Sequence, residues 1–172
     1  SDDQPKFMNS PQTAFFDKGS LLYGLDKSYM RIREEGVAVL VEGYMDVIAA
    51  HQAGFTNVVS AMGTALTEKQ LRLLKRYAPR VVLALDPDVA GDRATLRSLT
   101  VARQNLERES APIFDPRGLL RDEGHLELDI RVATMPNEMD PDELIASNPE
   151  SWRSLISKAP SIVDYVMEVF IC

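Results

Sequence analysis

Two short, uninterrupted apolar runs constrain the fold of this chain more than any other feature of its sequence. Residues 37–41 read Val-Ala-Val-Leu-Val and residues 81–85 read Val-Val-Leu-Ala-Leu. A strand with both faces buried has this continuous pattern, whereas a strand with one face in water alternates apolar and polar residues. Both runs therefore predict central strands of a parallel sheet that helices cover on both faces.

Segments with helical or strand patterns surround these two runs. In chain order we expect a helix over 20–34 that Gly36 ends, the strand 37–41, a helix over 45–53, a strand over 57–60, a helix from Thr67 to Tyr77, the strand 81–85, a long helix over about 91–108 and a strand over 127–134. Strands joined by helical segments indicate parallel pairing with right-handed crossovers. The expected fold class is therefore α/β, with an open parallel sheet of about four strands flanked by helices and a C-terminal helical segment.

Composition excludes several classes of protein. No apolar run approaches the roughly 20 residues that a membrane-spanning helix needs, so we expect no membrane partner. The single cysteine, Cys172, cannot form an internal disulfide or a cysteine-based zinc site, so we expect no zinc and a reducing, cytoplasmic setting. The net charge of -7 argues against a free-standing nucleic-acid-binding domain, although residues 61–108 hold nine basic residues against five acidic ones.

Acidic residues follow the predicted strands at the points where those strands end. Glu42 directly follows the first strand, Asp86 and Asp88 follow the third, and Asp140 and Asp142 lie just beyond the fourth. The carboxyl ends of parallel strands meet at one edge of the sheet, where open α/β folds place their chemistry. Gathered carboxylates repel one another, and a bound divalent cation relieves that repulsion. Because every candidate ligand is an oxygen, the pattern favours Mg²⁺.

Each of these acids also has a purely structural interpretation. Residues 42–43 and 86–88 are compatible with plain turns, and Asp46 with a first-turn residue that the helix dipole favours. Asp140 is well placed as a helix N-cap, with proline at the first helical position and Glu143 closing a capping box. Both interpretations stay open for the individual residues at this point.

A phosphate-binding element is predicted at the start of the long helix. Residues 91–93 read Gly-Asp-Arg. Free backbone N–H groups at a helix start suit a phosphate, and Arg93 adds a positive charge. Phosphate beside a metal held by carboxylates is what phosphoryl or nucleotidyl transfer needs.

Three motifs resemble the Toprim core of bacterial DnaG-type primases. They are Val-Glu-Gly-Tyr-Met-Asp-Val at 41–47, Ala-Met-Gly-Thr-Ala-Leu-Thr at 61–67 and Leu-Asp-Pro-Asp-Val-Ala-Gly at 85–91. Flanking stretches such as Asn-Ser-Pro-Gln-Thr at 9–13 and Asp-Pro-Asp-Glu-Leu at 140–144 agree in order, so the resemblance covers about residues 7 to 168. It implies a Toprim fold and a DNA-templated RNA polymerase that makes short primers for DNA replication by nucleotidyl transfer.

The resemblance also implies roles for individual residues. Glu42, Asp86 and Asp88 correspond to the catalytic, metal-binding acids of the family, and Asp140 and Asp142 are expected as further metal ligands. Residues that correspond to the nucleotide and phosphate site are Asp46, Gly63, Thr64, Gly91 and Arg93. The expected cofactor is Mg²⁺, for which Mn²⁺ substitutes.

The resemblance further implies a domain organisation and partners. Residues 1–36 are expected to form a lead-in segment and helix, 37–146 the Toprim catalytic core with an irregular loop at 111–125, and 147–172 the truncated start of a helical subdomain. The expected partners are a single-stranded DNA template and NTPs, through the full-length protein, and the replicative helicase, through a C-terminal domain absent from this chain. We expect a bacterial, cytoplasmic protein at the nucleoid and replisome, and an isolated fragment that is weakly active or inactive.

Two departures from the family pattern keep alternatives open. Pro87 stands where the family commonly has glycine, and the loop 111–125 is longer than usual. One alternative is another Toprim enzyme, of the nuclease or topoisomerase type. A second is a haloacid-dehalogenase-type phosphatase, because residues 86–89 match the first motif of that family. Outside the enzymes, the alternatives are a receiver module and a degenerate Toprim scaffold.

Overall fold

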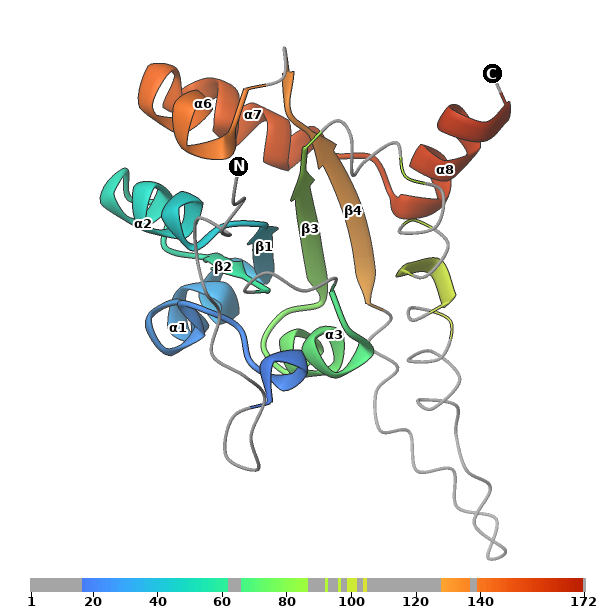
Figure 1. Ribbon diagram of the computed structural model, residues 1–172, viewed down its shortest axis with the longest axis horizontal. Helices are drawn as coiled ribbons and strands as arrows, with labels where there is room; N and C mark the ends of the chain where they lie inside the picture. Colours follow the sequence, from blue (N-terminus) through green and yellow to red (C-terminus); the bar gives the residue numbers. More distant parts are fainter. Residues whose placement is uncertain are drawn as a thin grey trace, which may run out of the picture.

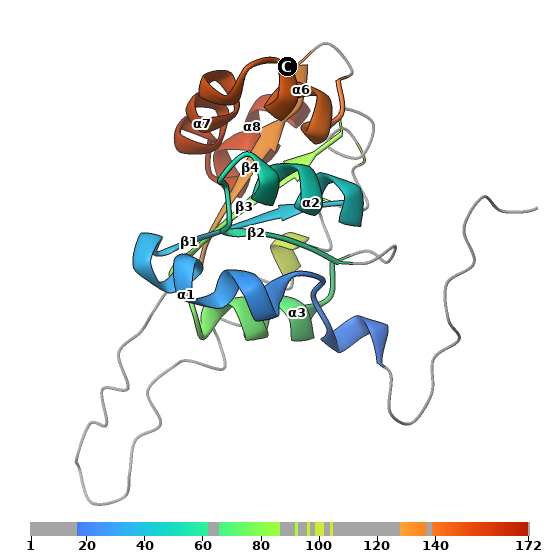
Figure 2. The same ribbon diagram turned by 90° about the vertical axis from the view of Figure 1, so that its left-hand side faces the viewer.

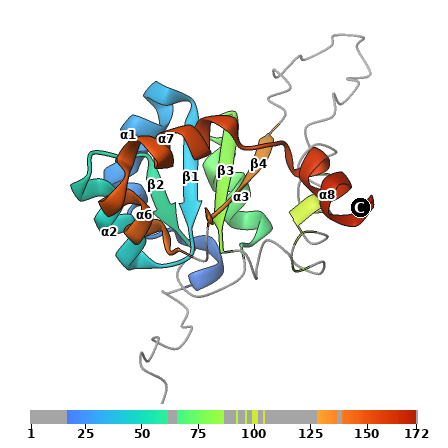
Figure 3. The ribbon, with the colours of Figure 1, turned by 90° about the horizontal axis from the view of Figure 1, so that it is seen from above.

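Four parallel strands form the centre of the computed structural model of this chain (Figure 1). The strands are β1 (Val37–Val41), β2 (Val58–Ser60), β3 (Arg80–Leu85) and β4 (Asp129–Thr134). Their order in the sheet is β2-β1-β3-β4, and all three pairs are parallel, as Figure 3 shows from above. The predicted α/β class and parallel sheet are therefore confirmed, and the first and third strands of the chain are neighbours in this sheet.

The structure describes residues 17–61, 66–86, 92, 96, 99–101, 104, 128–136 and 139–171, with the side chains of 169–171 excepted. Of the long helix expected over 91–108, the described residues 96, 99–101 and 104 are helical. The loop expected at 111–125 lies outside the described residues. Within the described part of the chain, no helix combines the length and the apolar character that crossing a bilayer requires.

Helices cover both faces of the sheet (Figure 2). A short 3-10 helix, η1 (Lys18–Ser20), leads in to α1 (Leu25–Glu35), which lies with α3 (Glu68–Lys75) on one face. The opposite face carries α2 (Tyr44–Gln52), α6 (Pro141–Ser147) and α7 (Pro149–Lys158), and α8 (Ile162–Ile171) lies beside the edge strand β4.

The core explains why the central strands read as continuous apolar runs. Ala38 and Leu40 of β1 belong to the buried cluster that contains Ile32 of α1, together with Leu71 and Leu74 of α3. The alternate residues of the same strand, Val39 and Val41, belong to a second cluster with residues of α2, α6 and α7. Every position of β1 after Val37 is therefore buried, on one face or the other.

The expected helix over 20–34 begins later than predicted. Gly24 has a left-handed backbone, with φ of 81°, and the helix starts only at Leu25. Just before it, Tyr23 forms an isolated antiparallel bridge with Ser60 at the end of β2. The apolar spacing of Leu21 and Leu25 matched a helix, but the chain turns between them in order to reach the sheet.

Side chains cap the starts of two helices. The Thr67 side chain accepts a hydrogen bond from the Gln70 N–H, and the Gln70 side chain accepts one from the Thr67 N–H, which makes a capping box at the start of α3. Asn148 caps α7 by accepting a hydrogen bond from the Ser151 N–H. In α8, Ile162 is fully buried, whereas the neighbouring Val163 is 47% exposed.

Candidate active site

Glu42 and Asp86 meet at the carboxyl edge of the two central strands. Glu42 directly follows β1 and Asp86 directly follows β3, and these strands are hydrogen-bonded neighbours. Partial removal from water raises the pKa of the Glu42 carboxyl, and the negative charge of Asp86 raises it further, although the backbone N–H of Asp86 donates a hydrogen bond to it. The predicted convergence of the first and third strand ends is thus present in the structure.

Asp46 joins this cluster from the first turn of α2. Its carboxylate accepts a hydrogen bond from the backbone N–H of Gly43 at 3.1 Å. Partial burial raises the pKa of Asp46, the Gly43 N–H lowers it, and the charges of Asp142 and Asp140 raise it, with a net upward shift. A side chain at position 43 would interfere with this arrangement, because a Cβ there would lie 2.8 Å from the Asp46 carboxylate. Any larger residue at position 43 would therefore require the Asp46 carboxylate to move.

Asp140 and Asp142 approach the cluster from the start of α6, which packs against α2. Asp140 is the N-cap residue of α6, but its side chain makes no capping hydrogen bond. The Glu143 N–H instead donates to Asp142 at 2.8 Å, so the capping box that Asp140 and Glu143 were able to form is not made. The structural interpretation of Asp140 is therefore only partly met, while its charge raises the pKa of both Glu42 and Asp46.

The structure thus brings together five of the predicted site residues: Glu42, Asp46, Asp86, Asp140 and Asp142. The other five, Gly63, Thr64, Asp88, Gly91 and Arg93, lie outside the described residues, as does Pro87. All five residues carry carboxylates, and the pKa of two of them, Glu42 and Asp46, is raised by burial and by the negative charges around them. Oxygen ligands of this kind are the ones that a hard divalent cation accepts.

Four of the five predicted metal ligands, Glu42, Asp86, Asp140 and Asp142, belong to the described part of the chain. Within residues 17–61, 66–86, 128–136 and 139–171, no three acidic, histidine or cysteine side chains are close enough to enclose one ion. Mg²⁺ commonly binds through one or two protein carboxylates and keeps several waters. A pair such as Glu42 and Asp86 is compatible with that mode of binding.

One residue that supports the site could not be recognised in the sequence. The hydroxyl of Ser60, at the end of β2, donates a hydrogen bond to the backbone carbonyl of Glu42 at 2.6 Å. A single serine at the end of a short strand carries no signal of such a contact. Only the register of β1 against β2, with Val41 opposite Ser60, reveals it.

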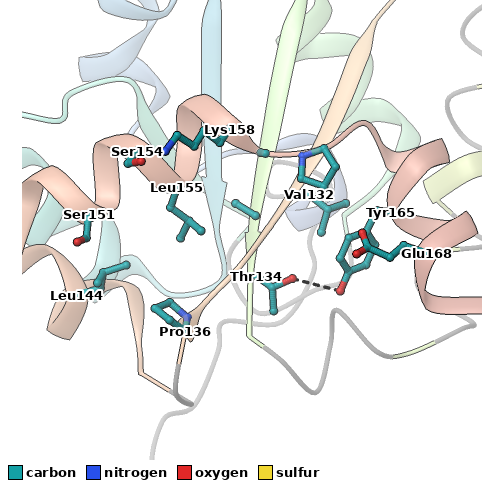
Figure 4. Close-up of a pocket in the computed structure, with 13 residues that line it drawn as sticks. Val132, Thr134, Pro136, Leu144, Ser151, Ser154, Leu155, Lys158, Tyr165 and Glu168 are labelled. Atoms are coloured by element: carbon teal, nitrogen blue, oxygen red, sulfur yellow. Dashed lines mark hydrogen bonds between the residues drawn. The ribbon is translucent and has the colours of Figure 1, made fainter. Parts of the chain in front are cut away.

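A separate pocket of about 500 Å³ lies at the edge of the sheet, between β4, α7 and α8 (Figure 4). Apolar side chains such as Leu144 and Leu155 line it, together with Lys158 and Glu168. On its floor, the hydroxyls of Thr134 and Tyr165 are 3.1 Å apart and hydrogen-bonded. None of the residues that line it belongs to the acidic cluster, so it is not the candidate active site.

Comparison with known proteins identifies relatives of this chain. A family model described as Toprim-like matches residues 39–115, which include the last three residues of β1 and all of α2, β2, α3 and β3. The DNA primase of Clostridium acetobutylicum is 42% identical over 165 residues, which cover 95% of this chain and 24% of that protein. This chain therefore spans about a quarter of the length of that relative.

Solved structures are similar over almost the whole chain. The structure of the Aquifex aeolicus primase, with its zinc-binding and RNA polymerase domains, has a TM-score of 0.71 at 31% identity. The match extends over 98% of this chain and 37% of the Aquifex aeolicus chain. A DnaG primase catalytic domain solved with single-stranded DNA has a TM-score of 0.72 at 28% identity, over 98% of this chain and 49% of that one. With the acids at the strand ends and the parallel sheet, these likenesses show that the chain belongs to the family of bacterial DnaG-type DNA primases and corresponds to the Toprim-containing part of their catalytic core.

Proposed function

We propose that the protein to which this chain belongs is a DNA primase, and that the acidic cluster is its centre of nucleotidyl transfer. The observation that carries the proposal is the meeting of Glu42 and Asp86 at the ends of adjacent strands, with Asp46 and Asp140 close enough to raise the pKa of Glu42. Carboxylates crowded in this way bind protons or cations more readily than isolated ones. A polymerase that joins nucleotides uses a divalent cation at such a site.

Each acid has a proposed task in this reaction. Glu42, Asp86 and Asp88 hold Mg²⁺, or Mn²⁺ in its place, and Asp140 and Asp142 provide further oxygen ligands. The bound cation supplies positive charge that offsets the charge on the leaving pyrophosphate. As an alternative to a ligand role, Glu42 is proposed to accept the proton of the attacking hydroxyl.

Other residues are proposed to position the nucleotide. Gly91 and Arg93 bind its phosphates, and Gly63 and Thr64 line the same cleft. Asp46 fixes the turn between β1 and α2 through its hydrogen bond with Gly43 and so keeps the carboxylates together.

The proposed partners follow from the same function. The template is single-stranded DNA, in keeping with the primase domain solved with such a strand, and the substrates are NTPs. The replicative helicase is proposed to bind a part of the full-length protein outside this chain, and the protein to act at the replisome in the bacterial cytoplasm. The phosphatase alternative is not favoured, because a strand that ends in an acidic residue precedes the Asp86 strand and lies next to it. The receiver alternative is not favoured, because the relatives that match almost the whole chain are DNA primases.

Two measurements test the proposal together. Mn²⁺ binding to this chain is followed by calorimetry, and primer synthesis on single-stranded DNA is measured with the full-length enzyme. The variant is Asp86→Asn/Asp88→Asn, and the control is Asp26→Asn/Glu34→Gln, which removes two exposed charges from α1. We expect the variant to lose both Mn²⁺ binding and primer synthesis while the control retains them. Primer synthesis that survives in the variant would overturn the proposal.

A further inference from the structure

Ser60 contacts the peptide that carries Glu42 from the neighbouring strand. Its side chain is completely buried, and its hydroxyl donates to the Glu42 carbonyl at 2.6 Å. This contact is made to the backbone of Glu42, so the carboxylate stays available for other partners. The hydrogen bond therefore acts on the position of Glu42 and leaves its charge unchanged.

The place of this bond in the sheet gives it a specific effect. The ladder between β1 and β2 ends with the pair Val41 and Ser60, so Glu42 lies one residue beyond the last backbone pairing. The Ser60 hydroxyl provides one more hydrogen bond at this point and extends the restraint of the sheet to Glu42.

Ser60 itself is held from both sides. One neighbour is β1, and on the other side the Tyr23 N–H donates to the Ser60 carbonyl at 2.8 Å, while the Ser60 N–H donates to the Tyr23 carbonyl at 3.2 Å. The Tyr23 ring also contacts the ring of Tyr44, the first residue of α2, at 6.0 Å between centroids. The backbone that carries the Ser60 hydroxyl is therefore held by hydrogen bonds on both sides.

We propose that Ser60 is a positioning residue of the active site, whose buried hydroxyl fixes the Glu42 peptide and thereby holds the Glu42 carboxylate beside the end of β3. The inference rests on the proposed function, in which Glu42 binds a divalent cation. Ser60 touches neither the cation nor the substrate and acts only through the backbone of Glu42.

The chain offers a matched control for this role. Ser28 is also completely buried, and its hydroxyl donates to a backbone carbonyl of β2, that of Val58, at 3.0 Å. Val58 lies at the start of β2, whereas Ser60 lies at its end, beside the acidic cluster. Ser28→Ala therefore removes a buried bond from a serine hydroxyl to a backbone carbonyl away from the acidic cluster, together with the contact of that hydroxyl with His51 at 3.2 Å. Ser60→Ala removes a bond of the same kind beside the cluster.

Two readouts on the 172-residue chain test the inference. Amide hydrogen exchange over residues 42–46 measures how firmly the turn is held, and it requires no metal. Calorimetric titration with Mn²⁺ measures the affinity of the site. For Ser60→Ala we expect about tenfold faster exchange over 42–46 and about fivefold weaker Mn²⁺ binding, the scale of one lost hydrogen bond. Ser28→Ala should change neither quantity more than about twofold, and Ser60→Thr, which keeps the hydroxyl, should restore both.

The outcomes separate this inference from the proposed function. Unchanged exchange at 42–46 in Ser60→Ala, or equal effects of the two alanine variants, overturns the positioning role. Faster exchange with wild-type Mn²⁺ affinity overturns it as well, because the restraint then has no effect on the site. A wild-type chain and enzyme that need no divalent cation overturn the proposed function instead, while the exchange data still decide whether Ser60 holds the turn. If Ser60→Ala does not fold, Ser60→Cys is used, because it keeps the shape and donates only weakly.

Discussion

Gln70 provides the sharpest test of how the lead-in segment is attached to the Toprim core. This side chain is completely buried at the start of α3. Its carbonyl oxygen accepts a hydrogen bond from the Thr67 N–H at 3.0 Å, and its amide nitrogen donates to the carbonyls of Lys18 at 3.1 Å and Leu21 at 2.7 Å. One side chain thus closes the cap of α3 and holds the segment before α1. We expect Gln70→Ala to loosen both.

The magnitude follows from these three hydrogen bonds. Each contributes about 1 kcal/mol, and a buried partner left without a bond costs more. We therefore expect Gln70→Ala to lower the free energy of unfolding by about 2 to 3 kcal/mol.

A second substitution at this position separates hydrogen bonding from packing. Gln70→Glu keeps the size and the acceptor for Thr67, but when ionised it places a negative charge against the carbonyls of Lys18 and Leu21. These contacts and the burial raise the pKa of the introduced carboxyl above its unfolded value. The stability of this variant should therefore fall as the pH rises from about 4 to 7, while that of Gln70→Ala stays parallel to the wild type.

Urea unfolding followed by circular dichroism and by tryptophan fluorescence provides the assay. Trp152 is the one tryptophan of the chain and is 1% exposed, so its emission reports on the opposite face of the sheet. Gln52→Ala, at an exposed position of α2, is the control and should stay within about 0.5 kcal/mol of the wild type. A loss below about 1 kcal/mol in Gln70→Ala would refute the reasoning, because it would mean that water replaces all three bonds.

Three further outcomes are expected. Asp46→Asn should stabilise the metal-free chain against urea at pH 7 but not at pH 4. The pKa of Asp46 is raised in the folded state, so the stability that this carboxyl contributes is present below its ordinary pKa of 3.8 and is lost as the pH rises through its folded pKa. Equal gains in stability at both pH values would contradict this argument. Gly24→Ala should lower the thermal midpoint more than Gly54→Ala. Both glycines have positive φ, but a Cβ at position 24 would also lie 3.0 Å from the Val47 side chain, whereas a Cβ at position 54 would meet no atom within 4 Å. Equal shifts, each worth about 1 to 2 kcal/mol, would show that only backbone strain matters. Gly43→Ala should displace the Asp46 carboxylate and weaken Mn²⁺ binding in calorimetry with little loss of stability, whereas unchanged affinity would show that the carboxylate moves without consequence.

Much of the sheet could be predicted because burial on both faces leaves a direct record in the sequence. The ranges 37–41 and 81–85 agree with β1 and β3 to within one residue. The lead-in helix was placed too early because Leu21 and Leu25 share a helical spacing although a left-handed glycine separates them. The 47% exposure of Val163 could not be predicted either, because periodicity indicates which residues share a helix face but not how much of that face is covered.

The candidate site was predictable to the extent that it depends on strand ends. Glu42 and Asp86 follow apolar runs, so the parallel topology alone brings them together. The contacts of Ser60 and Gln70 depend on how segments distant in sequence lie against one another, and polar residues of this kind have many uses. Nothing in the local sequence distinguishes them from ordinary strand and helix residues.

The pairing of β3 with β4 has a consequence for how the chain reaches its fold. Arg80 and Asp129 are partners in this ladder, and the hydrogen bond between their side chains joins residues 49 positions apart. Closing so long a connection costs little more free energy than closing a short one, since each doubling adds only about 0.6 kcal/mol. It does, however, slow folding, because distant segments must meet before the contact stabilises either. The crossover before β4 is therefore a place where related chains can gain or lose residues with little effect on equilibrium stability, at the expense of the rate at which the last strand docks.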